Sequence, residues 1–166
     1  MATLIAVPVL GALVILQSAV VSRVPLIAGT ADLILLALIA WAVQERVTTA
    51  WQWSVMGGLM VSLVSASSAS VTLGGYLLAT GIAVVLRYRV WRIRLLSMLA
   101  ATFFGTLITH ALTIFSLRLN ETAIPILESF NLITLPSILL NLLVAVPMYA
   151  LISDLANWLY PEEIEL

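Results

Sequence analysis

The chain contains no cysteine and no lysine, it has a single histidine, His110, and only 9% of its 166 residues are charged. Without cysteine it forms neither disulfides nor thiolate metal sites, and one histidine cannot make a metal-binding histidine cluster. A soluble domain carries roughly 25% charged residues. The 63% of hydrophobic residues and the mean hydropathy of +1.17 exclude soluble, disordered and collagen-like chains and predict an integral membrane protein.

The few charged residues divide the chain into apolar runs of membrane-spanning length. At about 1.5 Å per residue, roughly 20 helical residues cross a ~30 Å hydrocarbon layer. Residues 47–86 hold no charge over forty positions, so we expect a helical hairpin whose bend lies at the small residues 66–70. The prediction is an all-α, polytopic membrane protein with a single transmembrane domain, 1–166. Its six expected transmembrane helices cover residues 2–22, 26–44, 48–66, 70–86, 95–117 and 131–154.

The arginines indicate how the chain is oriented. With six spans, one side of the membrane holds a majority of them: Arg46, Arg87, Arg89, Arg92 and Arg94. Because basic short loops are retained in the cytoplasm, both termini are expected there. The same interface is expected to hold all five tryptophans, Trp41, Trp51, Trp53, Trp91 and Trp158. The run 87–94 is interpreted as a cytoplasmic basic loop, either a topology anchor beside anionic lipid or a docking strip for an acidic partner.

Small residues recur at helical spacing in the predicted hairpin. Helices in lipid associate where small side chains let their backbones approach closely. One hypothesis is packing within the hairpin itself, and the other is a groove for the transmembrane helix of a partner. The candidates for partner-helix packing are Gly57, Gly58, Ser62, Ser65, Gly74 and Gly75.

Hydroxyl groups form a stripe along the predicted fifth helix, spaced by three and four residues. Such hydroxyls bond to their own backbone and can join helices without defining an activity. A path for a polar ligand is the alternative. The stripe consists of Thr102, Thr106, Thr109, Thr113 and Ser116.

Two ionisable residues, Asp32 and His110, lie within the predicted spans proper, and with the amide Asn141 they are the intramembrane polar candidates. Ionisable groups inside a membrane are costly, so they usually face the protein interior and pair. We therefore expect Asp32 and His110 to hydrogen-bond, either as a structural pair or as a proton relay. Asn141 lies between Pro136 and Pro147, which are expected to kink the last helix.

Motifs for catalysis and cofactor binding are absent from the sequence. It shows no nucleophile–base–acid set, no carboxylate pair flanking a site and no phosphate-binding loop. The net charge of −1 gives no indication of nucleic-acid binding. A protein that is not an enzyme, without catalytic, cofactor-binding or metal-binding residues, is therefore expected.

Three segments carry a family resemblance that extends over nearly the whole chain. Residues 31–36, Ala-Asp-Leu-Ile-Leu-Leu, look like a Pro-Asp-Leu-Leu-Leu-Leu opening of a second helix. Residues 57–62 and 72–76 are similar to a Gly-Leu-Leu-x-Asp…Leu-Gly hairpin, and residues 135–141 with Pro147 to a last helix. These are features of the MreD family of bacterial rod-shape-determining membrane proteins, which the chain resembles.

The resemblance implies a non-catalytic scaffold of the bacterial cytoplasmic (inner) membrane that supports peptidoglycan synthesis and cell shape. It would bind the single transmembrane helix of MreC, in a complex that includes MreB, RodA and its transpeptidase partner. The family's fold is similar to the substrate-binding subunits of energy-coupling-factor transporters, so a small-ligand-binding transporter subunit is the alternative. Ala31 stands where the family often has proline, and Ser62 where it often has an acidic residue.

Overall fold

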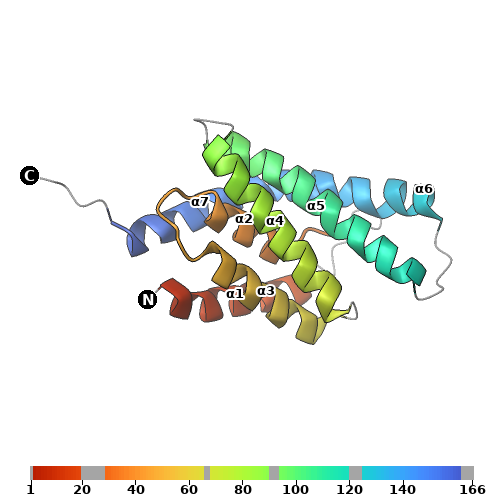
Figure 1. Cartoon of the computed structure of the whole chain (residues 1–166), viewed down its shortest axis with the longest axis horizontal. Helices are drawn as coiled ribbons and strands as arrows, with labels where there is room; N and C mark the ends of the chain where they lie inside the picture. Colours follow the sequence, from red (N-terminus) through yellow and green to blue (C-terminus); the bar gives the residue numbers. More distant parts are fainter. Residues whose placement is uncertain (1, 20–28, 66–67, 90–93, 120–124, 162–166) are drawn as a thin grey trace, which may run out of the picture.

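The computed structural model describes residues 2–19, 29–65, 68–89, 94–119 and 125–161, and these ranges are predominantly helical. Figure 1 shows the helices and both ends of the chain. In chain order the elements are α1 (Ala2–Ala19), α2 (Leu33–Ala42), α3 (Ala50–Val64), α4 (Ala69–Arg89), α5 (Arg94–Leu119), α6 (Ile126–Ser129), the π-helical segment η2 (Phe130–Thr134) and α7 (Leu135–Leu159).

Four helical stretches are long and apolar enough to cross a membrane: α1, α4, α5 and the run from Leu127 to Leu159. The chain is therefore a helical membrane protein, as its composition predicts. The expected hairpin is also confirmed, because α3 and α4 pack against each other on either side of a short connection (Figure 1). The expected fifth helix, 95–117, corresponds closely to α5.

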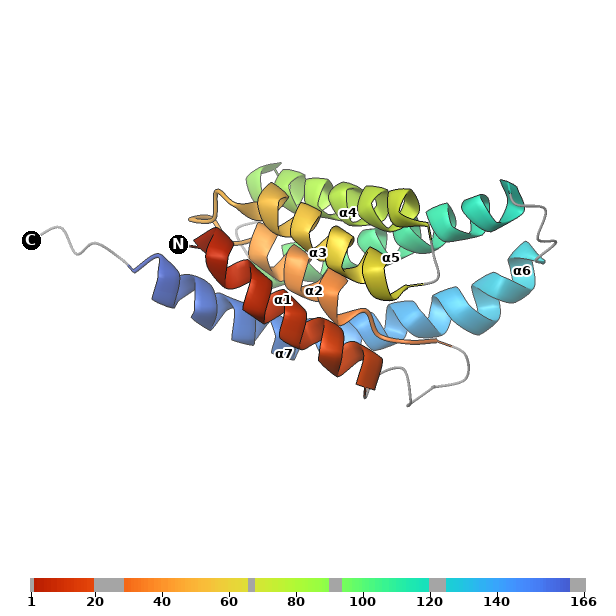
Figure 2. The ribbon, with the colours of Figure 1, turned by 90° about the horizontal axis from the view of Figure 1, so that it is seen from below.

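The second predicted helix, 26–44, is much shorter than expected. Within the described residues it comprises only the ten residues of α2, about 15 Å of helix and half of a hydrocarbon layer. No residue of α2 is more than 6% exposed. The other helices α1, α3, α4, α5 and α7 all contact it, and Figure 2 shows it in the middle of the bundle. The prediction of a full-length span is wrong for the described residues, because α2 is a short central helix enclosed by protein.

The last helix is longer than the predicted 131–154 and contains a widened turn. Helical residues continue from Ile126 to Leu159, and the N–H of Leu135 bonds to the carbonyl of Phe130, five residues earlier. Pro136 follows directly, and proline both lacks an N–H and crowds the preceding turn. A π-helical turn accommodates such a residue without ending the helix.

Three of the glycines expected to bind a partner helix pack inside the chain instead. A Cβ atom built on Gly58 would lie 2.7 Å from Cδ1 of Leu73, and one on Gly75 would lie 2.9 Å from Cγ2 of Thr109. Gly57 faces α2 with similarly little space. Because neighbouring helices already occupy these positions, another chain cannot reach them. The internal-packing hypothesis applies to Gly57, Gly58 and Gly75, and the partner-helix hypothesis is wrong for them.

The remaining candidates are placed differently. Gly74 has no atom within 4 Å of a built Cβ, so it borders open space on α4. Ser62 and Ser65 are partly exposed, and the hydroxyl of Ser62 donates to the carbonyl of Leu59 at 2.7 Å. Gly74 and Ser62 thus remain accessible to a partner helix.

The tryptophans do not form a uniform interfacial belt. Trp41 and Trp53 are fully buried and stacked, with 4.1 Å between their ring centroids. Their indole N–H groups donate to the hydroxyl of Thr49 and to the carbonyl of Ala2. These two rings therefore join α1, α2 and α3 in the interior, contrary to the expectation. Trp51 and Trp158 are exposed, and Trp91 lies outside the described residues.

One tightly packed glycine, Gly58, and one that borders open space, Gly74, give a matched test of the packing. Gly58→Leu should lower the melting temperature of the purified protein, because overpacking a tight helix contact costs about 1–3 kcal/mol. Gly74→Leu should leave the melting temperature unchanged, because its side chain enters open space. Thermal unfolding in detergent followed by circular dichroism measures both, and equal losses would contradict the packing described for α3 and α4.

Candidate functional site

Asp32 holds the N-terminal end of α2 and connects it to two other helices. Its Oδ1 accepts the N–H of Leu35 at 2.9 Å, which caps the helix, and its Oδ2 accepts the hydroxyl of Tyr76 on α4 at 2.8 Å. The backbone N–H of Asp32 donates to Oδ1 of Asn141 on α7 at 2.8 Å. One residue therefore orders the start of α2 and fixes its position against α4 and α7.

Further side chains extend these contacts into a network, which we call the Asp32 network. Nδ2 of Asn141 donates to Oγ1 of Thr106 on α5 at 2.9 Å, and Oε1 of Gln17 on α1 accepts the N–H of Leu33 at 2.8 Å. The first N–H groups of a helix lack partners within it, and no water is present in a hydrocarbon layer to bind them. The network supplies those partners through Gln17 on α1, the N-cap residue Asp32 and Asn141 on α7.

The other end of α2 is held by Arg87. Its Nη1 donates to the carbonyls of Ala42, Gln44 and Val47, at 3.2, 2.7 and 3.1 Å. A guanidinium there satisfies free carbonyls and complements the negative end of the helix dipole. The expectation that Arg87 belongs to a loop is therefore wrong, since it lies on α4 and its guanidinium binds the end of α2. Its position on the cytoplasmic side stays a prediction.

Two other arginines of the expected loop, Arg89 and Arg94, lie at helix ends. Arg89 is the last residue of α4, Arg94 is the first of α5, and Arg92 lies outside the described residues. Arg94 forms an exposed ion pair with Glu45, with 3.1 Å between Nη2 and Oε2. Anchoring at a membrane surface stays a prediction for these three residues.

A cavity of about 190 Å³ lies beside the Asp32 network. The helices α1, α3, α4, α5 and α7 contribute to its walls, which meet beside the N-terminal end of α2. Its lining is largely polar and includes Gln17, Asp32, Tyr76, Thr109, His110 and Asn141. We call this space the Asp32 cavity.

His110 lines the same cavity but is not bonded to Asp32. Its Nδ1 lies 3.3 Å from Oγ1 of Thr134, on the π-helical segment η2. The hydrogen bonds that the Asp32 carboxylate accepts come from Leu35 and from Tyr76. The expected hydrogen bond between Asp32 and His110 is therefore wrong, although the structure places both residues on one cavity wall.

The hydroxyl stripe of α5 faces the interior. Thr109 donates to the carbonyl of Gly105 at 3.0 Å, and Thr113 donates to that of Thr109 at 2.9 Å. Thr106 joins α5 to α7 through Asn141. The stripe therefore joins helices near its middle, as expected of helix glue, and Thr109 and Thr113 line the cavity beyond that point.

Sequence reasoning missed Tyr76 and Arg87 as partners of α2. The signal for Tyr76 was weak, because one tyrosine in an apolar helix is commonplace. Arg87 stood at the start of a dense basic run, where solvent exposure is the ordinary interpretation. Gln17 did offer a signal, since it is the one amide in the first apolar run.

The three segments that carry the family resemblance meet in this site. Asp32 comes from the first, Tyr76 from the second and Asn141 from the third, and hydrogen bonds from Tyr76 and to Asn141 meet at Asp32. No family model, no curated protein and no solved structure matches this chain.

Removing the amide at the centre of the network should destabilise the fold. Asn141→Leu leaves the N–H of Asp32 and the hydroxyl of Thr106 without this partner, and each unpaired buried group costs about 1–3 kcal/mol. The exposed Asn131, also near the start of the last helix, provides the control Asn131→Leu. Hydrogen exchange at the amides of Leu35 and Leu36 should accelerate in Asn141→Leu alone. Unchanged exchange would show that the network does not hold the start of α2.

The two arginines at the opposite end give a second matched pair. Arg87→Met should lower the melting temperature strongly, because three carbonyls at the end of α2 lose their donor. Arg94→Met should change it little, since an exposed ion pair contributes about 0–1 kcal/mol. Thermal scans in detergent compare them, and a larger loss for Arg94→Met would overturn the role given to Arg87.

Proposed function

We propose that the chain is a non-catalytic scaffold of the bacterial cell-wall elongation machinery, as its resemblance to the MreD family implies. It would lie in the cytoplasmic membrane with both termini in the cytoplasm and bind the single transmembrane helix of MreC. Through this partner it would hold MreB, RodA and the transpeptidase near one another. Helix packing within the bilayer would supply the binding energy.

The observation that carries this proposal is the convergence of three sequence segments on Asp32. Tyr76 and Asn141 follow Asp32 by 44 and 109 positions in the sequence, and both are hydrogen-bonded to it. The resembling segments thus form one structural core, which supports the resemblance to a family of scaffolds.

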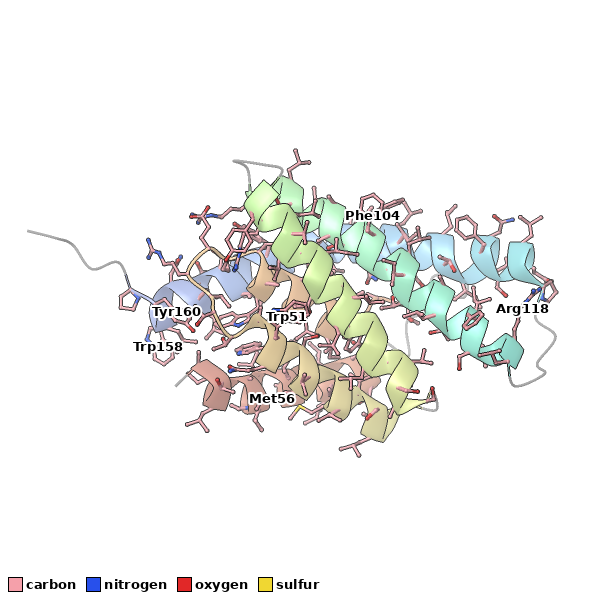
Figure 3. All side chains as sticks on the ribbon, in the orientation of Figure 1. Trp51, Met56, Phe104, Arg118, Trp158 and Tyr160 are labelled. Carbon is pink, nitrogen blue, oxygen red and sulfur yellow. The ribbon has the colours of Figure 1, made fainter. Side chains whose placement is uncertain are left out.

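The arrangement of the ends supports the proposed orientation. Figure 1 places the start of α1 and the end of α7 at one end of the bundle, and Figure 3 shows Trp158 and Tyr160 there and Arg118 at the other. Arg46 donates to the carbonyl of Tyr160, so this arginine belongs to the end with the termini. A basic end is typical of the cytoplasmic side, whereas aromatic residues gather at both membrane interfaces.

The outer face of α4 offers a place for the partner helix. Ser70 is exposed, Gly74 borders open space one turn later, and Leu78 is 52% exposed one turn beyond it. Two small residues four positions apart let a second helix approach closely in lipid. We therefore place the MreC helix against Ser70 and Gly74, not against Gly58 or Gly75.

A second candidate function is favoured by the Asp32 cavity. A ligand-binding subunit of an energy-coupling-factor type transporter needs an interior cavity with converging polar groups, and such groups line this space. A scaffold by itself does not need one. Ligand capture is therefore the alternative to be distinguished by experiment.

Co-purification with tagged MreC of the same organism, in mild detergent, tests the proposal. The complex should form and survive high salt, because intramembrane packing is not screened as surface charge is. Gly74→Leu should reduce the recovered partner severalfold without lowering the melting temperature. Gly11→Leu is the matched control, since Gly11 on α1 also borders open space.

The outcomes separate the two functions. Loss of the complex in Gly74→Leu alone supports the scaffold and its interface on α4. A complex unaffected by Gly74→Leu retains the scaffold but moves the interface to another face. A chain that does not bind MreC and purifies with an ATPase module and a small molecule would replace the scaffold with the transporter subunit.

A further inference from the structure

A second hollow adjoins the Asp32 cavity on the side of α1 and α3. It has a volume of about 330 Å³, and its walls are mainly apolar, with Val14, Ile34, Val61 and Val64 among them. Gln17, Val61 and Ser65 line both spaces. The Asp32 cavity, a polar chamber, therefore adjoins an apolar cleft along these three residues, and we call this second space the α1–α3 cleft.

The hydrogen-bonding capacity left in the polar chamber consists largely of acceptors. The hydroxyl of Tyr76 donates to Asp32, and those of Thr109 and Thr113 donate to backbone carbonyls. Asn141 uses its Nδ2 on Thr106. Each hydroxyl keeps free lone pairs after donating its proton, so the chamber suits a ligand that brings donors.

The charge of the chamber points to the same kind of ligand. Among the described residues that line it, Asp32 is the one carboxylate, and no arginine is present. His110 is the single residue there that can become cationic, and its Nδ1 lies against Thr134 rather than Asp32. Carboxylates within a membrane ordinarily pair with a positive group. A ligand with a cationic head would provide that group.

We propose that this chain binds an amphipathic molecule with an ammonium head and an aliphatic tail. The head occupies the Asp32 cavity, where its three N–H groups meet the carboxylate and the hydroxyl lone pairs. The tail lies in the α1–α3 cleft, among Val14, Val61 and Val64. Such a molecule enters from the bilayer. This inference goes beyond the scaffold role and holds whether or not MreC binds.

Binding of single-chain amphiphiles to the full chain in a maltoside detergent tests the proposal. The probes are dodecylammonium, dodecanol and dodecanoate, which share a tail and differ in the head. Dodecylammonium should raise the melting temperature saturably, and native mass spectrometry should show one bound molecule. Dodecanol should bind at least about tenfold more weakly, because a hydrogen bond to a charged group contributes about 1.4 kcal/mol or more. Dodecanoate should not bind.

Two variants separate recognition of the head from accommodation of the tail. Asp32→Asn keeps a good N-cap, so α2 can still form, and it should weaken dodecylammonium binding about 10- to 100-fold. Val61→Phe fills the junction of the two spaces and should reduce the affinity of both dodecylammonium and dodecanol. The control is Leu63→Phe, because Leu63 is 88% exposed on the outward face of α3. This variant should bind dodecylammonium and dodecanol as the unmodified chain does.

The proposal is overturned if dodecylammonium, dodecanol and dodecanoate bind with equal affinity, because that result would indicate unspecific uptake of alkyl chains. It is also overturned if Val61→Phe binds dodecylammonium as tightly as Leu63→Phe does. If Asp32→Asn does not fold, the comparison of the three heads on the unmodified chain and the Val61/Leu63 pair still decide the matter.

Discussion

A ten-residue helix at the centre of a membrane protein must have both of its ends satisfied by protein groups. The helix α2 meets this constraint with side chains from its neighbours, because hydrocarbon offers no water to its free N–H and C=O groups. Asp32, Gln17 and Asn141 accept N–H groups at the start, and Arg87 donates to carbonyls at the end. A carboxylate at the positive end and a guanidinium at the negative end also complement the helix dipole.

The same constraint explains features at a distance from α2. The chain approaches the start of α2 directly over α7, where a Cβ on Gly29 would lie 2.6 Å from Cβ of Pro136 and 2.7 Å from the backbone nitrogen of Ser137. Ser137 in turn accepts the N–H of Thr30 at 3.2 Å. Glycine is needed at that crossing, because any side chain would push the segment away from α7 and from Asn141.

The predictable and the unpredictable parts of this structure differ in physical origin. Long apolar runs dictate α1, α4 and α5, so hydropathy located them, and the small residues near 66–70 located the hairpin bend. The shortness of α2 could not be read from its sequence, because Leu33–Ala42 is as apolar as a lipid-facing span. Its ends are set by tertiary partners, Tyr76 and Arg87, which come from a helix further along the chain. The pairing of His110 with Thr134 depends likewise on a π-helical turn that sequence periodicity does not reveal.

The scaffold face and the polar chamber are connected through α4. Gly74 points into open space on one side of this helix, whereas Tyr76, two residues later, reaches Asp32 on the other. Between them Gly75 is tightly packed against Thr109, which also lines the chamber. In the proposed scaffold, a partner helix at Gly74 would contact the same segment of α4 that is packed at Gly75 and hydrogen-bonded to Asp32 through Tyr76. The proposed partner and the proposed ligand would therefore contact opposite sides of one helix.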